Sequence, residues 1–395
     1  MARTTLLIPG PTPLPPEVRR AMNRQMINHR GPVFGGMVRE LLDGLRTIFQ
    51  TSNDIMPLNS TGTGGLEASI VNFLCQGDRV LSVNNGSYAE RWAAIAEQYG
   101  VRVDRVKAEW GEPTPLAAVA GRLRADVGQE YRAVLITQSE TSTGVLNDVR
   151  GVREALGDHP ALLMVDGVSS IGAVPIETDG WGVDVAVTAS QKALMSPPGL
   201  AFVSVSDRAW EAAERSTLPK FYFDLRKGRS QIQGALPGTP FTTNVSIVFA
   251  AHAAVRLILR EGLPSVFERH RRLARAARAA VRGMGLRTLA EDAYAVDTVT
   301  PVLMPHGVQG RMVAARARDA YDVVLGGGVG PQAREVVRIG HLGYTKPSWL
   351  LAGLEALGRS IGDLGHPVDT AAGLAAARQE LETDAVRPTG PGRVD

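Results

Sequence analysis

Short apolar runs alternate with longer amphipathic segments through the middle of the chain, and this rhythm constrains the fold more than any other feature. The apolar runs, rich in Val, Ile and Leu, are residues 79–83, 133–137, 161–165, 183–188 and 200–205. The amphipathic segments, which we expect to be helices, are residues 64–75, 87–99, 115–127 and 149–157. Buried strands that alternate with helices predict an α/β fold, with a mostly parallel central sheet and helices on both of its faces. Ligands of such sheets bind at the carboxyl ends of the strands.

The sequence divides into four parts. Residues 1–16 are expected to be an extended N-terminal arm, because the prolines of PGPTPLPP (9–16) lack an N–H and fix φ. Residues 17–269 are expected to form a large domain. A long helix-like stretch, 245–284, leads into a smaller C-terminal α/β domain, residues 270–365, with strand candidates at 296–303 and 334–339. Residues 366–395 are expected to be a terminal helix and a disordered tail, since 386–395 are rich in Pro and Gly.

Composition excludes several classes of function. The chain has 395 residues, 44% hydrophobic and 21% charged, with a net charge of only +3. No run of Lys and Arg is interleaved with aromatic residues, so we expect no nucleic-acid partner. Cys75 is the only cysteine, which excludes an intramolecular disulfide and a cysteine-based zinc site. No apolar run approaches the roughly 18 residues of a membrane span, so we expect a cytoplasmic protein with no membrane partner and no metal.

A cluster of small residues precedes one predicted helix. The sequence Ser-Thr-Gly-Thr-Gly-Gly-Leu-Glu (60–67) opens an apolar helical stretch. Small residues leave the backbone N–H groups of a helix N-terminus accessible, which makes an anion site suited to phosphate. A flexible glycine turn capped by threonine is the alternative. The segment is not a Walker A loop, because no Gly-Lys-Ser/Thr follows.

Two ionisable residues follow buried strands further along the chain. Asp166 ends the apolar run 161–165, and a buried carboxylate requires a cationic partner or strong donors. Lys192 comes after the run 183–188 among small residues, where partial desolvation would lower the pKa of its amine. Each alone has an ordinary alternative, a turn-capping aspartate or a surface lysine. Together with the anion loop at one sheet edge, they supply what pyridoxal phosphate (PLP) requires.

At this point the chain resembles a known family, the class V aminotransferases of PLP-transferase fold type I. The resemblance is carried by Ser-Gln-Lys-Ala-Leu (190–194) with Pro-Pro-Gly (197–199), by Glu-Thr-Ser-Thr-Gly (140–144) and by Arg-Ile-Gly (338–340). It extends from Pro-Gly-Pro-Thr (9–12) to about residue 360 and is greatest to the alanine–glyoxylate, serine–pyruvate and serine–glyoxylate aminotransferases. It implies that residues 17–269 are the PLP-binding domain.

The resemblance assigns catalytic and ring-binding roles by position. Lys192 would form the Schiff base with the cofactor and move a proton between the substrate and the cofactor. Asp166 would pair with the pyridine nitrogen. Val168 and Tyr88 would pack on the two faces of the ring, and Thr141 would hydrogen-bond its phenolic oxygen.

Binding roles are implied in the same way. Arg338 would hold the substrate carboxylate, with a surface ion pair as its ordinary alternative. Thr239 would reach the phosphate of a neighbouring subunit, which implies a homodimer with shared active sites. Phosphate binding falls to four residues: Thr63, Gly64, Gly65 and Gln191. Three departures from the pattern, Gly65, Leu236 and Thr243, leave the individual phosphate contacts open.

The implied reaction is ping-pong transamination from serine or alanine to glyoxylate or pyruvate. The same chemistry on aminoethylphosphonate, pyridoxamine or a biosynthetic intermediate stays open, although the anion loop disfavours a pyridoxamine-specific enzyme. A cysteine desulfurase or another lyase is a further alternative. It is disfavoured because Cys75 lies in an apolar segment and Tyr88 stands where desulfurases have histidine. A non-catalytic binding module is disfavoured because Lys192 and Asp166 are both present.

Overall fold

The structure, a computed structural model, describes residues 4–383 and is built on a seven-stranded sheet. The strand order is β2-β10-β9-β8-β5-β3-β4, and within this sheet only β10 runs against its neighbours. The strands are β2 (Asp54–Leu58), β3 (Arg79–Asn84), β4 (Arg102–Lys107), β5 (Tyr131–Thr137), β8 (Leu162–Asp166), β9 (Val185–Ala189) and β10 (Ala201–Val205). The predicted α/β fold with a mostly parallel sheet is confirmed.

Each of the five apolar runs forms a strand of this sheet, because a strand covered on both faces needs apolar side chains on both. The two strands that the pattern did not predict, β2 and β4, lie at the edges of the sheet. β4 reads Arg-Val-Asp-Arg-Val-Lys, and all its residues except Val106 are at least partly exposed. An edge strand needs fewer apolar residues, so β4 lacks the pattern by which the central strands were recognised.

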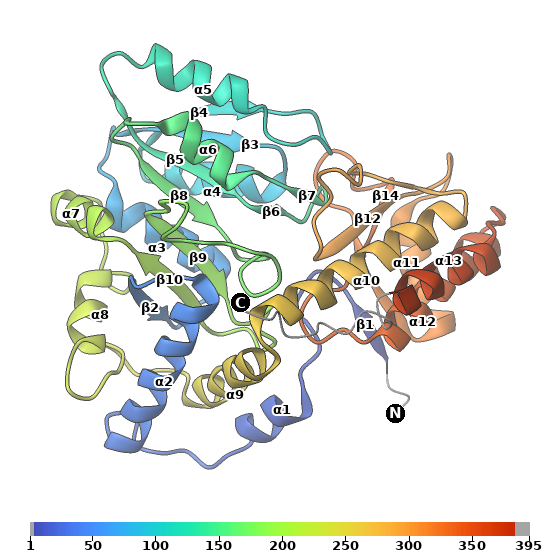
Figure 1. Ribbon diagram of the computed structural model, residues 1–395, viewed down its shortest axis with the longest axis horizontal. Coiled ribbons are helices and arrows are strands. Elements are labelled where there is room, and N and C mark those ends of the chain that lie inside the picture. The colour runs from blue at the N-terminus through green and yellow to red at the C-terminus, as the bar shows by residue number, and fades with distance from the viewer. Residues whose placement is uncertain (1–3, 384–395) are drawn as a thin grey trace, which may run out of the picture.

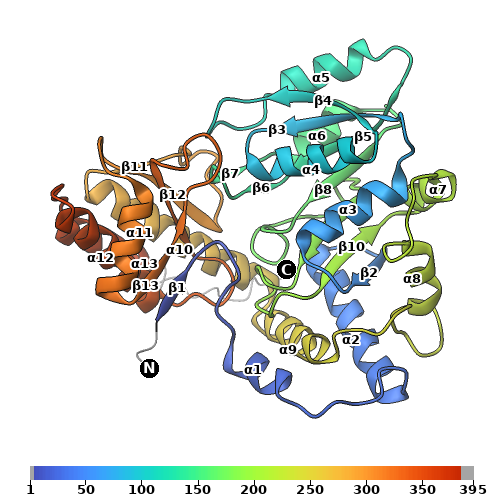
Figure 2. The same ribbon diagram turned by 180° about the vertical axis from the view of Figure 1, so that it is seen from behind.

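Helices cover both faces of the sheet. Figures 1 and 2 view the molecule from opposite sides, with α6 in front of the sheet in one view and α3 and α4 in front in the other. The helices of this part are α2 (Pro32–Phe49), α3 (Gly62–Phe73), α4 (Ser87–Gln98), α5 (Leu116–Ala125), α6 (Val149–Leu156), α7 (Asp207–Arg215) and α8 (Leu225–Ile232). The short hairpin β6 (Ser139–Glu140) and β7 (Val145–Leu146) follows β5.

The predicted helical stretch 245–284 consists of two helices, α9 (Val245–Glu261) and α10 (Leu263–Gly283). They meet at Gly262, whose φ of +81° and ψ of 135° are outside the helical region. Pro264 then occupies the first turn of α10, where its missing N–H leaves no hydrogen bond unmade. This Gly-Leu-Pro break redirects the chain from the large sheet toward the C-terminal elements (Figure 1).

A second sheet has the order β1-β13-β14-β12-β11. Its strands are β1 (Thr5–Leu7), β11 (Arg287–Thr288), β12 (Val299–Leu303), β13 (Val323–Gly327) and β14 (Val336–Gly340). β1 pairs in parallel with β13, so the first strand of the chain completes a sheet made otherwise from its last third. The remaining helices are α1 (Pro16–Met22), α11 (Gly310–Tyr321), α12 (Pro347–Asp363) and α13 (Thr370–Thr383).

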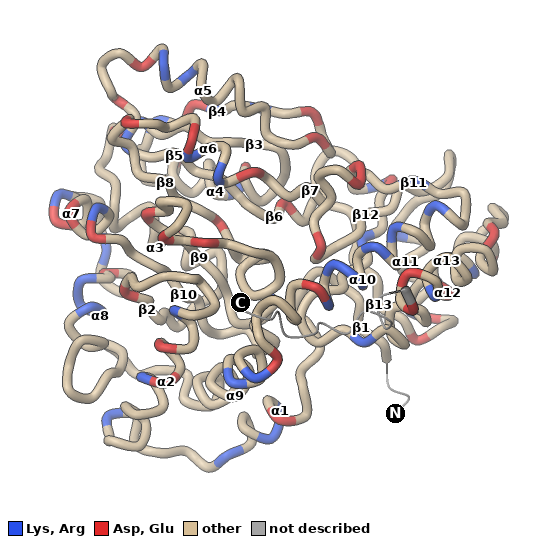
Figure 3. The backbone as a smooth tube through the Cα atoms, in the orientation of Figure 1, with Lys and Arg blue, Asp and Glu red and all other residues tan. Residues whose placement is uncertain are grey.

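Each sheet has its own hydrophobic core. The large core includes Trp92, Phe202 and Phe249, and the smaller one includes Leu7 beside Val337 and Leu354. Basic and acidic residues are both scattered over the molecule (Figure 3). No helix within the described residues is long and apolar enough to cross a membrane. The tail predicted to be disordered, 386–395, lies outside the described residues.

Candidate active site

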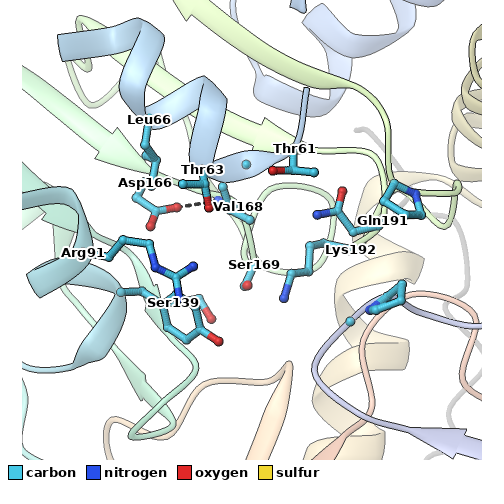
Figure 4. A pocket seen from close by; sticks show the side chains of 15 residues that line it. Thr61, Thr63, Leu66, Arg91, Ser139, Asp166, Val168, Ser169, Gln191 and Lys192 are labelled. Carbon is cyan, nitrogen blue, oxygen red and sulfur yellow. Dashed lines mark hydrogen bonds between the residues drawn. The ribbon is translucent and has the colours of Figure 1, made fainter. Parts of the chain in front are cut away.

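A cavity of about 240 Å³ opens where β5, β8 and β9 end, at the edge where parallel strands present their carboxyl ends (Figure 4). It collects residues from six separate segments of the sequence. The lining residues are Gly10, Pro11, Thr61, Gly62, Thr63, Leu66, Tyr88, Arg91, Ser139, Asp166, Val168, Ser169, Gln191, Lys192 and Pro198.

The first turn of α3 forms one wall of the cavity. Thr61 precedes the helix, its side chain makes no capping hydrogen bond, and Gly62 and Thr63 follow it along the wall. The first N–H groups of a helix have no partner within it, so this wall presents donors together with the positive end of the helix dipole. That combination binds anions such as phosphate.

Gly64 and Gly65 do not line the cavity but allow α3 to pack closely. A Cβ on Gly64 would lie 1.9 Å from the Ser60 hydroxyl oxygen, and one on Gly65 would lie 2.7 Å from Val187 Cγ1 of β9. The N–H of Gly65 already donates to the carbonyl of Thr61 at 3.1 Å. The absence of a side chain at Gly65 is therefore explained by helix–sheet contact.

Asp166 is a buried carboxylate with only neutral hydrogen-bond donors. Its Oδ1 accepts from the N–H of Val168 at 2.9 Å and its Oδ2 from the hydroxyl of Thr137 at 3.3 Å. Burial raises the pKa of Asp166 to about 6, repulsion from Glu140 adds to the rise, and Lys192 opposes it. Within residues 4–383 Asp166 has no ion-pair partner, so a cationic group placed beside it would find a free acceptor.

Lys192 reaches the cavity from the loop after β9, where its Nζ donates to the carbonyl of Pro9. Burial lowers the pKa of the Lys192 amine to about 8, the positive charges of Arg338 and Arg91 lower it further, and Asp166 opposes them. An amine with this pKa is partly unprotonated near neutral pH, as a nucleophile or a proton acceptor requires.

Tyr88 lies in the first turn of α4, and Arg91 lies at the start of the second. The guanidinium carbon of Arg91 lies 4.9 Å from the centre of the Tyr88 ring, and both side chains line the cavity. Residues three apart on a helix share one face. That spacing was visible in the sequence once Tyr88 had been singled out, yet Arg91 was missed.

The Glu140 side chain binds the N-terminus of α4. Its carboxylate is fully buried and accepts the N–H groups of Tyr88 and Ala89 at 3.0 Å each, as well as the N–H and hydroxyl of Ser142. Burial raises the pKa of Glu140, and these donors oppose the rise. Glu140 thus caps α4 from another strand and fixes the turn that carries Tyr88. It lay within the Glu-Thr-Ser-Thr-Gly motif, but no periodic pattern connects it to α4.

Five of the predicted residues lie outside the cavity lining: Gly64 and Gly65, described above, and Arg338, Thr141 and Thr239. Arg338, on β14, donates from Nε to the carbonyl of Gly327 at 2.7 Å and from Nη1 to that of Thr141 at 3.1 Å. Thr141 is thereby next to Arg338 through its backbone. Thr239 is buried elsewhere and donates to the carbonyl of Phe241 at 2.7 Å. The other predicted residues Thr63, Tyr88, Asp166, Val168, Gln191 and Lys192 all line the cavity.

A seven-stranded, mostly parallel sheet brings a helix N-terminus, a buried carboxylate and an amine to one edge, an arrangement suited to a PLP-dependent transaminase. The chain belongs to one family of these enzymes, since the profile of "Aminotransferase class-V" matches residues 5–316. The resemblance seen in the sequence is confirmed.

Curated relatives and solved structures agree with the family. The chain is 41% identical to the L-aspartate–glyoxylate aminotransferase of Paracoccus denitrificans over 383 residues, 96% of each chain. It is 38% identical to the serine–glyoxylate aminotransferase of Arabidopsis thaliana, again over 96% of each. The crystal structure of alanine–glyoxylate aminotransferase from Nostoc sp. superposes with a TM-score of 0.87 at 32% identity, covering 91% of this chain and 96% of that one.

Proposed function

We propose that this transaminase uses pyridoxal phosphate to move the amino group of serine or alanine to glyoxylate or pyruvate. The observation that carries the proposal is the meeting of Lys192, Asp166 and the α3 N-terminus in one cavity. Relatives of similar length that are named for glyoxylate support this class of acceptor.

The residues present fit the cofactor. The side-chain oxygen of Gln191 is buried without a hydrogen-bond partner in the described structure, so the amide is free to turn its N–H group toward a phosphate. Thr63 would add a hydroxyl, and the unpaired N–H groups in the first turn of α3 would add backbone donors. Gly65 contributes through packing. Asp166 provides the acceptor for a protonated ring nitrogen.

Each side chain then has a definite task. Bound pyridoxal phosphate supplies an electron sink and an aldehyde carbon that takes up the amino group. Lys192 Nζ would supply the amine for that aldehyde and would move the proton at the α carbon of the donor. Tyr88 and Val168 would pack against the ring, and Thr141 would hydrogen-bond its phenolic oxygen. Arg338 exchanges its two backbone carbonyl partners for the substrate carboxylate, which a guanidinium binds through two parallel hydrogen bonds.

The cofactor assignment is tested by colour. Purified protein mixed with pyridoxal phosphate should gain a visible absorption band, and Lys192→Ala should not gain the wild-type band. As a control, Lys220→Ala removes a lysine that donates only to Ser216 and Leu218, away from the cavity. A colourless wild-type protein, or a Lys192→Ala protein with the unchanged band, would contradict the proposal.

Aspartate is a second candidate donor, and Arg91 is the observation that favours it. This guanidinium lines the cavity in addition to Arg338 nearby, so the site offers a cation for each carboxylate of a dicarboxylic amino acid. Serine, alanine and aspartate should be compared as donors with glyoxylate and pyruvate. If aspartate is bound in this way, Arg91→Gln should raise KM for aspartate much more than KM for alanine.

The enzyme is also proposed to act as a homodimer. Phe221, Tyr222 and Phe241 form a cluster of stacked rings, here called the aromatic patch. Phe221 is 71% exposed and Tyr222 45%, and the Phe241 ring lies 5.7 Å from the first and 5.0 Å from the second. Large exposed apolar groups of this kind mark interaction surfaces. Thr239 lies two residues before Phe241 and does not line the cavity of its own subunit. A residue that binds the phosphate in the partner subunit would be placed in this way.

The single free cysteine, Cys75, supports the proposal that the protein is located in the cytoplasm. Cys75 is a free cysteine, and free thiols persist in reducing compartments. Its hydrogen bond runs to the carbonyl of Arg215, remote from Lys192 and outside the cavity lining. A desulfurase role for this thiol therefore finds no support in its position.

A further inference from the structure

The Pro-Gly-Pro-Thr motif at residues 9–12 has no role in the function described so far. These residues directly follow β1, which is bound to β13 in the second sheet. β13 is also paired with β14, where Gly326 lies opposite Arg338. The motif thus leaves the sheet that carries Arg338 and passes to the cavity, where Gly10 and Pro11 form part of the lining.

Three hydrogen bonds join this segment to Lys192 and its neighbour. The Lys192 amine donates to the carbonyl of Pro9. The hydroxyl of Thr12 donates to the carbonyl of Lys192 at 3.1 Å, and the N–H of Thr12 donates to the carbonyl of Gln191 at 3.1 Å. Thr12 is only 4% exposed, so water does not compete for these bonds. Both ends of the Lys192 residue, its amine and its peptide, are therefore held by the arm.

Glycines let the arm fit between Lys192 and the second sheet. A Cβ on Gly340 would lie 2.2 Å from the carbonyl of Ile8, and one on Gly326 would lie 2.8 Å from Pro9 Cδ. On the other side, a Cβ on Gly10 would lie 2.7 Å from Lys192 Cδ, and Gly10 has a φ of +108°. The backbone of the arm is thus in close contact on both sides, which leaves Pro9 little freedom to move away from Lys192.

We propose that residues 9–12 are positioning residues for Lys192: the Pro9 carbonyl holds its amine whenever the amine is not bonded to the cofactor, and Thr12 fixes its peptide. The proposal rests on the proposed function in taking Lys192 as the reacting amine. A defined resting place returns the amine to the same position in each half of the reaction. The contact also fixes the position of the Lys192 amine relative to Arg338, because residues 9–12 continue from β1, and β1 belongs to the sheet that carries Arg338.

The test of the Pro9 contact uses Gly10→Ala. The added methyl group collides with Lys192 and displaces the amine from the carbonyl, which removes an acceptor that favours the ammonium form. The other charged groups facing Lys192, namely Asp166, Arg338 and Arg91, stay in place. The midpoint pH for acetylation of Lys192 should therefore fall by about one unit. Mass spectrometry of the full chain without cofactor measures it, with the other lysines as internal references.

Gly77→Ala is the matched control. Gly77 also has a positive φ, +84°, but a Cβ there meets nothing within 4 Å, so this variant carries the backbone strain alone. Its Lys192 midpoint should equal that of the wild type. Equal midpoints in Gly10→Ala and Gly77→Ala would overturn the role of Pro9. Acetylation needs no turnover, so this result is independent of whether serine, alanine or any other donor is used.

The role of Thr12 is tested in the enzyme with bound cofactor. Thr12→Val keeps the shape of the side chain but loses the donor to the Lys192 carbonyl, whereas Thr12→Ser keeps the donor. We expect kcat to fall about ten-fold in Thr12→Val with KM for the donor nearly unchanged, because proton movement is impaired and binding is not. Thr12→Ser should restore kcat. Loss of kcat in both variants alike, or in neither, would show that the hydroxyl does not position Lys192.

Discussion

At the scale of the residue, two buried aspartates of the large sheet illustrate the difference between a site and a scaffold. Asp184 accepts from the N–H of Leu163 and the hydroxyl of Ser206, and it pairs with Arg208 at 3.1 Å. Asp166 is as deeply buried but has no cation within ion-pairing distance among the described residues. Burial raises the pKa of both carboxyls. Among these two aspartates, only the carboxylate of Asp166 would need a bound cation to neutralise its charge.

Asp166→Asn should therefore stabilise the protein without cofactor at pH 7 while abolishing its activity. The native pKa of about 6 exceeds the unfolded value of 3.8, so the native state binds more protons and stability falls as pH rises through this window. Removing the charge should recover on the order of 1–3 kcal/mol at pH 7 and little below pH 4. Asp184→Asn should recover less at pH 7, because Arg208 and the other donors already offset part of the cost of burying that carboxylate. Thermal melts of both variants at two pH values decide the matter.

Arg338 allows a second prediction at this scale. Arg338→Ala should lower kcat/KM for carboxylate substrates by on the order of 10²-fold or more while the visible band of the bound cofactor is kept. Arg338→Lys should recover only part of the loss, because an ammonium cannot form two parallel hydrogen bonds. Steady-state kinetics with alanine and glyoxylate measure both variants. Unchanged kinetics in Arg338→Ala would remove this residue from the substrate site.

At the scale of the element, α4 owes the position of its first turn to Glu140, which lies 52 positions after Tyr88 in the chain. Gly86 precedes α4 with an extended backbone, φ 178°, so it carries no strain. A Cβ there would nevertheless lie 2.2 Å from Glu140 Cγ. The glycine is needed for the close approach of the carboxylate that caps the helix.

Gly86→Ala should consequently destabilise the protein by about 1–3 kcal/mol, as overpacking a buried contact does, and weaken binding of the cofactor by displacing Tyr88. Gly121→Ala is the matched control. Gly121 lies within α5, a Cβ there meets nothing within 4 Å, and alanine favours a helix, so this change should stabilise slightly. Chemical denaturation and cofactor titration measure the two effects. Equal stability of the two variants would contradict the packing argument.

The elements that could be predicted from the sequence have a local periodic pattern. The features that could not be predicted depend on contacts between residues far apart in the chain. The central strands and helices α3 to α6 are visible because burial on one or both faces imposes a periodic pattern on neighbouring residues. Asp166 and Lys192 could be singled out because they interrupt or follow such patterns. The capping of α4 by Glu140 and the contact of Pro9 with Lys192 depend on residues distant in sequence, and no local pattern records them. The break between α9 and α10 did have a local signal, Gly262 followed by Pro264, but the stretch was predicted as one helix because Ala and Arg occur on both sides of it.

At the scale of the whole molecule, the aromatic patch predicts a dimer. Phe221→Asp should shift the protein toward monomers and make cofactor binding weaker, if Thr239 of one copy serves the site of the other. Val127→Asp places the same charge on a residue that is 90% exposed and outside the patch, so it should leave the dimer intact. Sedimentation analysis at several protein concentrations distinguishes the two. A monomeric wild type with full activity would exclude the shared site.

The pairing of β1 with β13 has a consequence for how the molecule is made. Synthesis proceeds from the N-terminus, so Thr5–Leu7 leave the ribosome more than 300 residues before their partner strand. The strands of the large sheet, which lie between residues 54 and 205, have all been synthesised well before that partner. Until β13 is made, the nascent chain must carry β1 unpaired with it. The Pro9 contact with Lys192 is thus expected to be among the last native contacts that a newly made copy acquires.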